Sequence, residues 1–212
     1  IHYSQALKID SRQPEVYNNL GTAYIHKGNI RKAIGYFQKS LQEKPDYAEA
    51  AENLRYARIN QNKLEDTALR LQDLIKTDPR NPALLTRLGN VYRQLGDHDE
   101  AISQYQEAIL IQPDFSQALY GLVLVYSNDR EYTKALEVLE DMRKLQPENP
   151  EIYYNIACIY AKRDMVNESI KWLKQAIEKG FDNWDLLKED PDLESIRKTE
   201  YVIELMKRRG NV

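Results

Sequence analysis

Large apolar residues recur every 34 residues along the chain, with polar residues between them. Within the first interval Tyr17, Leu20 and Tyr24 fall at helical spacing, and the apolar spacing resumes after a break at Gly28-Asn29. Rows of 34 residues that begin at Pro14 align one large aliphatic residue five times without slippage: Leu20, Leu54, Leu88, Leu122 and Ile156. Each row is therefore predicted to form two helices joined by a turn.

A column of mostly small residues follows the aliphatic column, and a mostly aromatic column comes three residues later. A small residue lets a neighbouring helix approach, and a large side chain from that neighbour fills the gap. Prolines close four of the rows, where each is expected to end a helix: Pro45, Pro79, Pro113 and Pro147. Because neither helix of a row can bury its apolar stripe alone, the rows are predicted to stack into one continuous core.

These columns resemble those of the tetratricopeptide repeat (TPR) family. The segments NNLGTAYIHKGNIRKAIGYFQKSLQEKPD and RLGNVYRQLGDHDEAISQYQEAILIQPD carry the resemblance most clearly. The resemblance implies an all-α fold, a right-handed superhelical solenoid of antiparallel helix pairs that forms one domain. Its expected parts are the second helix of a truncated repeat at 1–13, repeats at 14–47, 48–81, 82–115, 116–149 and 150–183, and C-terminal capping helices at 184–212.

The repeat at 48–81 departs most from the pattern. Arg55 and Arg58 replace the small residue and the tyrosine, and Asn62 replaces the turn glycine. Charged residues in core columns need a partner or an escape to solvent. We expect pairing or an extended, solvent-reaching side chain, and the alternative is a local kink that reshapes this part of the array.

The resemblance further implies that the first helix of each repeat lines a concave, partner-binding groove. One groove column holds an asparagine in three of five repeats: Asn19, Asn53 and Asn155. An asparagine amide both donates and accepts, so a row of them can hold the backbone of an extended peptide. The alternative is that water or a neighbouring turn satisfies each amide.

The same groove column carries Arg87 in the third repeat, and Asn90 lies one helical turn further along. Some members of the family clamp a C-terminal carboxylate with five groove residues, and Asn53 and Arg87 match two of them. Arg87 is thus either a contact to an acidic group of a peptide or a solvated charge. We include Arg87 and Asn90 among the predicted partner-binding residues.

Three apolar groove positions are predicted to form an anchor pocket for a bulky side chain in the last two repeats: Tyr120, Leu124 and Tyr154. The alternative is that these residues pack against the capping segment around Trp184. Both interpretations place a large apolar surface against a second segment, and they differ in whether that segment belongs to a partner.

Composition and charge narrow the function further. The chain is 42% hydrophobic and 30% charged, which suits a folded, mostly helical protein. The net charge of −3 and the acidic residues of the predicted groove disfavour a helical-repeat RNA binder, so no nucleic-acid partner is expected. No apolar stretch approaches the roughly 18–20 residues that span a bilayer. Because the chain begins at Ile1, it is expected to be a fragment, and its localisation stays open.

The residues needed for catalysis or metal binding are missing at the required spacings. No phosphate-binding glycine loop is present, and His2, His26 and His98 lie far apart in the repeat frame. Cys158 has no base placed beside it by spacing, so it is interpreted as a small neutral residue. We therefore predict no catalytic residue, no metal, no cofactor and no enzyme activity.

The sequence accordingly predicts a non-catalytic scaffold that binds a peptide or helical segment of a partner protein on its concave face. The alternative is a structural assembly module that self-associates or packs against an enzymatic domain of a longer parent chain. The truncated first repeat favours this alternative, because Tyr3, Ala6 and Leu7 have lost their partner helix and can pair with another copy.

Overall fold

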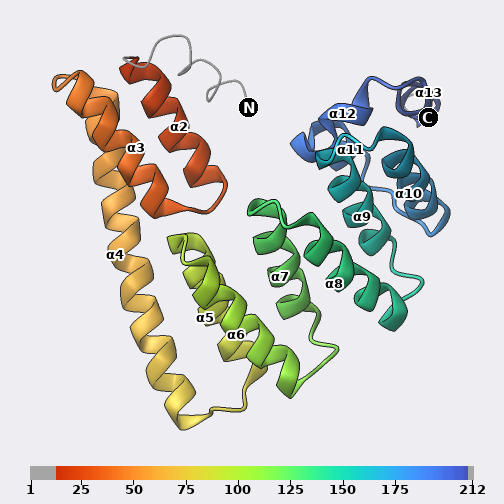
Figure 1. The fold of residues 1–212 in the computed structure, drawn as a ribbon, viewed down its shortest axis with the longest axis horizontal. Coiled ribbons are helices and arrows are strands. Elements are labelled where there is room, and N and C mark those ends of the chain that lie inside the picture. The colour runs from red at the N-terminus through yellow and green to blue at the C-terminus, as the bar shows by residue number, and fades with distance from the viewer. Residues whose placement is uncertain (1–12, 210–212) are drawn as a thin grey trace. The chain divides into compact units, whose positions relative to one another are not determined.

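The computed structural model describes residues 13–209, with side chains described through residue 207, and every regular element in this range is a helix (Figure 1). The helices are α2 (Pro14–His26), α3 (Ile30–Glu43), α4 (Ala48–Thr77), α5 (Pro82–Leu95), α6 (His98–Ile111), α7 (Ser116–Asn128), α8 (Tyr132–Leu145), α9 (Pro150–Lys162), α10 (Val166–Glu178), α11 (Trp184–Glu189), the 3-10 helix η1 (Pro191–Leu193), α12 (Glu194–Arg197) and α13 (Glu200–Arg209). The predicted all-α fold of antiparallel helix pairs is confirmed. The predicted half repeat at 1–13 lies outside the described residues, apart from Gln13.

The chain divides into two compact units, residues 1–121 and 122–212, which we call the first and second units. In the first unit α2 pairs with α3 and α5 pairs with α6. A Cβ atom at Gly21 would lie 2.4 Å from a ring carbon of Phe37, and one at Gly89 would lie 2.7 Å from Tyr105. The alternation of small and large columns therefore works as predicted, because glycine lets the paired helix bring its ring close.

The turns between paired helices reuse one backbone conformation at one column of the repeat. Gly28, Gly96, Arg130 and Asp164 all have positive φ, at 68°, 93°, 63° and 56°. Glycine adopts this left-handed conformation without a Cβ penalty, whereas the arginine and the aspartate adopt it at some cost. In the repeat at 48–81 the same column holds Asn62, which lies inside a helix and does not adopt this conformation.

Residues 48–77 form one continuous 30-residue helix, α4, in place of the predicted helix pair. Asn62 and its neighbours remain helical, because the segment NKLEDTALRL contains neither glycine nor proline. In the first repeat Asn29 caps the second helix, whereas the same column here holds Lys63, whose side chain cannot accept the capping hydrogen bond. Arg55 and Arg58 are both exposed. They reach solvent, as expected, and α4 continues without a break.

One face of α4 packs against both helix pairs of the first unit. A single hydrophobic cluster joins Ala57 and Leu71 of α4 to Phe37 of α3 and to Leu88 and Leu95 of α5. Polar contacts support this packing, since Arg31 forms ion pairs with Glu65 of α4 and with Asp97 in the turn before α6. The continuous helix α4 therefore joins the α2–α3 pair to the α5–α6 pair through one shared hydrophobic cluster.

The second unit is built from the end of α7, helices α8 to α10, and the capping helices. Ser169 of α10 donates from its hydroxyl to the carbonyl of Ala157 in α9 over 2.8 Å, which fixes the α9–α10 pair at a fully buried point. In the capping segment Leu187, Leu193 and Ile196 are buried. Among the described residues, no helix has the length and apolar character needed to cross a membrane.

Candidate partner-binding surfaces

The predicted asparagine column is divided between the two units, with Asn19 and Asn53 in the first and Asn155 in the second. Asn19 is exposed, and Asn53 and Asn155 are half-buried. The Asn53 amide donates to Asn18 Oδ1 over 3.0 Å, and the Asn18 amide donates to Glu49 Oε1 over 3.0 Å. A side chain of helix α2 therefore holds the Asn53 amide, where the alternative expected water or a turn, and this contact sets Asn53 beside the residue that precedes Asn19.

Arg87 and Asn90 lie on α5 in different environments. Arg87 is exposed, whereas Asn90 Oδ1 accepts a 2.8 Å hydrogen bond from the hydroxyl of Tyr105. The Tyr105 ring is fully buried between Gly89 and Gly121, and this burial raises the pKa of its hydroxyl. Asn90 thus satisfies the one polar atom of a buried aromatic side chain, a structural task that the sequence pattern did not reveal.

The predicted anchor pocket is not available at Tyr154. This residue is only 4% exposed; its ring stacks on Phe181 at 4.3 Å between centroids, and its hydroxyl donates to Asp190 Oδ2 over 2.7 Å. Burial, reinforced by Cys158 and Asp190, raises the Tyr154 pKa far above its usual range. The assignment of Tyr154 as a ligand anchor is therefore corrected: its ring packs on Phe181, just before the capping segment, and its hydroxyl bonds to Asp190 within that segment.

The other two anchor residues fall in different units. Leu124, in the second unit, is 49% exposed. Tyr120, in the first unit, is half-buried. The three residues are thus not brought together as one pocket by either unit alone.

The capping segment also covers the far end of α9. Lys162 forms a 2.7 Å ion pair with Asp192 and donates to the Ser127 hydroxyl over 2.8 Å. Cys158 Sγ lies 3.7 Å from Asp190 Oδ2, and burial followed by the nearby carboxylates raises the pKa of the thiol. The thiol is therefore held neutral at physiological pH, which removes its nucleophilic form.

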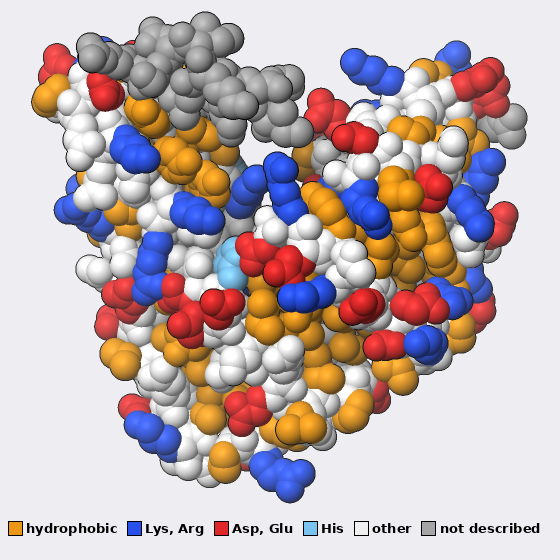
Figure 2. All heavy atoms as spheres, viewed as in Figure 1, with side chains coloured by type: hydrophobic (Ala, Val, Ile, Leu, Met, Phe, Trp, Pro, Cys, Tyr) orange, Lys and Arg blue, Asp and Glu red, His pale blue; other side chains and the backbone are white. Residues whose placement is uncertain are grey.

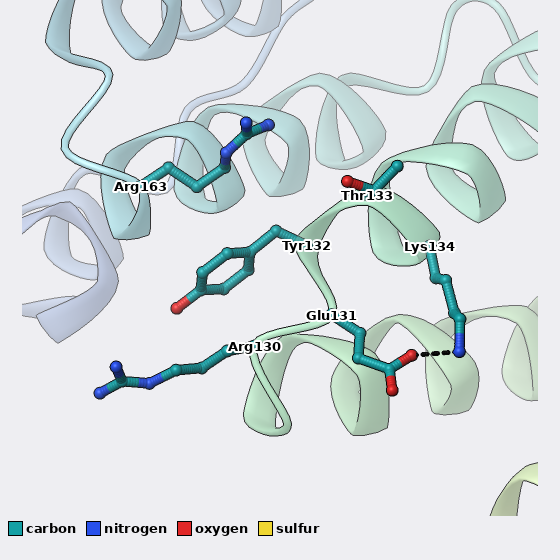
Figure 3. A pocket seen from close by; sticks show the side chains of 6 residues that line it. All are labelled: Arg130, Glu131, Tyr132, Thr133, Lys134 and Arg163. Atoms are coloured by element: carbon teal, nitrogen blue, oxygen red, sulfur yellow. Dashed lines mark ion pairs between the residues drawn. The ribbon is translucent and has the colours of Figure 1, made fainter.

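A cleft in the second unit was not predicted from the sequence. It has a volume of about 420 Å³ and lies between the α7–α8 turn and the end of α9; we call it the turn cleft. Its lining residues are Arg130, Glu131, Tyr132, Thr133, Lys134 and Arg163. Figure 3 shows the Tyr132 ring between the two arginine side chains, and Lys134 paired with Glu131 away from them. The sequence signal that could have revealed this cleft is Arg130 in the turn column, with Arg163 following it 33 residues later.

Charge is mixed on the one face that Figure 2 draws. On the face drawn in Figure 2, acidic and basic side chains are interspersed with hydrophobic ones. Among the described residues, no group of three or more His, Cys, Asp or Glu side chains is arranged to hold a metal ion.

Comparison with known proteins places the chain among TPR proteins. The sequence model described as "Psidin, N-terminal TPR repeats region" matches residues 14–177. The protein O-mannosyl-transferase Tmtc3 of Drosophila melanogaster is 25% identical over 165 residues, which cover 77% of this chain and 18% of that protein. The TPR repeat-containing protein YpiA of Bacillus subtilis is 21% identical over 172 residues, which cover 81% and 40%. The chain therefore spans less than half the length of each of these relatives.

Solved structures share the fold. MamA superposes with a TM-score of 0.51 at 26% identity, covering 75% of this chain and 93% of MamA. YrrB, described as a TPR protein with an unusual peptide-binding site, superposes with a TM-score of 0.52 at 17% identity, covering 87% and 95%. At that identity the likeness to YrrB shows the fold alone.

Proposed function

The chain belongs to the family described as the Psidin N-terminal TPR repeats region, and on that premise we propose that it is a non-catalytic scaffold that binds an extended peptide of a partner protein. The repeats occupy 14–177, and relatives named as transferases are far longer, since this chain covers only 18–20% of them. We therefore assign to these repeats the binding of a partner and leave transferase chemistry to other parts of such relatives.

The observation that carries the proposal is the polar contact between α2 and α4. The bond from Asn53 to Asn18 holds a half-buried amide next to the helix position of exposed Asn19. Two neighbouring amides on first helices can donate to and accept from a peptide backbone whatever its side chains are. This surface, formed by Asn19, Asn53 and Tyr56, is the proposed peptide site.

Tyr56 adds the apolar part of the proposed site. It follows Asn53 by three residues, so both side chains lie on neighbouring parts of the α4 surface, and it is 61% exposed. An exposed tyrosine offers a large contact area and a hydroxyl at a small entropy cost. Arg87 on α5 remains a proposed contact for an acidic group, and Asn155 on α9 remains a proposed contact in the second unit.

Partner capture from a native lysate tests the proposal when it is done with matched variants. The test variant is Asn19→Ala with Asn53→Ala, and the control is Gln38→Ala with Gln42→Ala, two exposed amides on the second helix α3. Each peptide-bonding amide contributes about 0.5–1.5 kcal/mol, so loss of both should weaken binding roughly 5- to 150-fold in the test variant.

Circular dichroism must first show that both variants keep the helix content of the parent chain. Loss of a partner from the Asn19 and Asn53 variant alone supports the proposed site. Equal retention by both variants overturns the site, and equal loss from both shows that the amides act through general surface effects.

A further inference from the structure

The turn cleft differs from the meeting of turns in the first unit in the ion pairs that its arginines form. In the first unit Arg31, just after the α2–α3 turn, forms an ion pair with Asp97 beside the α5–α6 turn. Asn29 of the first of these turns also lies against Gly96 of the other. An arginine from one turn region thus meets an acid from another, and the pair needs no outside partner.

In the second unit two successive turn regions bring two arginines to one cleft. Arg130 comes from the α7–α8 turn and Arg163 follows the last residue of α9. The one acidic lining residue, Glu131, is already paired with Lys134. Within residues 13–207, neither Arg130 nor Arg163 forms an ion pair, and the Arg163 guanidinium lies 6.0 Å from the centre of the Tyr160 ring.

We infer that the turn cleft binds a carboxylate side chain from an acidic segment of a partner protein. A guanidinium presents two parallel N–H donors that fit a carboxylate. The ends of Arg130 and Arg163 point away from one another in Figure 3, so each can engage a different acidic side chain of one segment. The Tyr132 ring between the arginines supplies an apolar wall for the methylene carbons of a glutamate (Figure 3). The external acid gives Arg130 and Arg163 the kind of partner that Asp97 gives Arg31 in the first unit.

This inference does not depend on the proposed peptide site, because the two surfaces lie in different units and share no residue. It also differs in chemistry. The asparagine surface recognises peptide backbone, whereas the turn cleft recognises the charge and planarity of a carboxylate. If the proposed peptide site is disproved, the turn cleft is unaffected, and the converse also holds, because separate variants test each surface.

Fluorescence anisotropy with a labelled peptide of alternating Glu and Asp residues tests the inference on the 212-residue chain. The test variant is Arg130→Ala with Arg163→Ala, and the matched control is Arg55→Ala with Arg58→Ala, which removes the same charge from exposed positions on α4. Saturable binding should weaken at least about tenfold in the test variant, because a hydrogen-bonded charge contact is lost at each arginine. Binding by the control should change less than about twofold.

Two further arms separate bidentate recognition from charge alone. The variant Arg130→Lys with Arg163→Lys keeps both charges and loses both planar donors, so its binding should still weaken about threefold or more. A peptide of alternating Gln and Asn residues should not bind at this site. Full binding by the lysine variant, equal loss in both alanine variants, or no saturable binding of the acidic peptide each overturns the inference.

Discussion

The repeat that contains α4 and the repeat formed by α9 and α10 carry the same 34-residue pattern and fold differently. In the latter, Ala157 and Ser169 are fully buried and joined by a hydrogen bond. At the same columns of the former, Arg55 and Thr67 are both exposed on one continuous helix. The comparison teaches that the period predicts where helices lie, whereas the residues at the turn and in the small column decide whether two of them fold back on each other.

The largest expected effect tests whether the second half of α4 has an unfilled face. Met142 and Leu74 share a column, but Met142 is 1% exposed and Leu74 is 49% exposed. Met142→Ala should lower the free energy of unfolding by about 2–5 kcal/mol, and Leu74→Ala by less than about 1 kcal/mol. Urea unfolding followed by circular dichroism measures both, and equal losses would mean that residues 48–77 close into a helix pair in solution.

The next test exchanges the turn residue itself. Gly96 has φ of 93°, and a Cβ there would lie 2.3 Å from Asn29 Oδ1, so Gly96→Ala should cost about 1–3 kcal/mol. Asn62 occupies the same column inside α4, where alanine is the better helix former, so Asn62→Ala should stabilise the chain by a few tenths of a kcal/mol. Thermal unfolding gives both signs, and a destabilised Asn62→Ala variant would argue for a turn at this position.

Alkaline pH should distinguish the covered face of α9 from the exposed face of α4. Burial raises the Cys158 pKa, so the folded state binds this proton more tightly, and the stabilisation is present at neutral pH and lost as pH rises through the unfolded value of about 8.5. Between pH 7.5 and 10 the free energy of unfolding should fall less in Cys158→Ala than in the parent chain, by about 1–2 kcal/mol. Identical pH profiles would show that the thiol is solvated.

The smallest expected effect concerns the ion pairs that tie Arg31 of α3 to α4 and to the turn before α6. The Arg31 side chain is 44% exposed, so Arg31→Ala should cost less than about 1 kcal/mol, and the cost should shrink in high salt. Arg55→Ala, on the unpartnered side of α4, serves as the control with no expected loss. Unfolding at low and high salt compares the two, and a loss that persists in high salt would point to packing by the arginine stem.

Much of the fold followed from the sequence, because the columns of large and small residues repeat without insertions and Asn29, Asn81 and Asn149 cap helices locally. The continuity of α4 did not follow, although Asn62 gave a warning, because a missing turn glycine is tolerated elsewhere. Arg130 and Asp164 make the same turn without it. A single non-glycine residue therefore does not decide between a turn and a helix.

The site was predicted less well than the fold, and the reason lies in side chains that spacing cannot pair. Tyr154 was predicted to contact a ligand because its repeat column faces the expected groove. Its hydroxyl instead donates to Asp190, which lies 36 residues later in the chain. Asn90 was treated in the same way, and Tyr105 uses it. The turn cleft was missed because its two arginines are significant only together, and their proximity depends on how successive turns stack.

The continuity of α4 also changes how the first unit should come apart. A linear array normally frays at the loops between its modules, since each loop is a place where local opening can stop. A helix of 30 residues, about 45 Å long, removes one such place and buries side chains from both flanking helix pairs in one cluster. Opening that reaches either end of α4 should therefore spread along its length, and amide hydrogen exchange across residues 48–77 should report a single cooperative block.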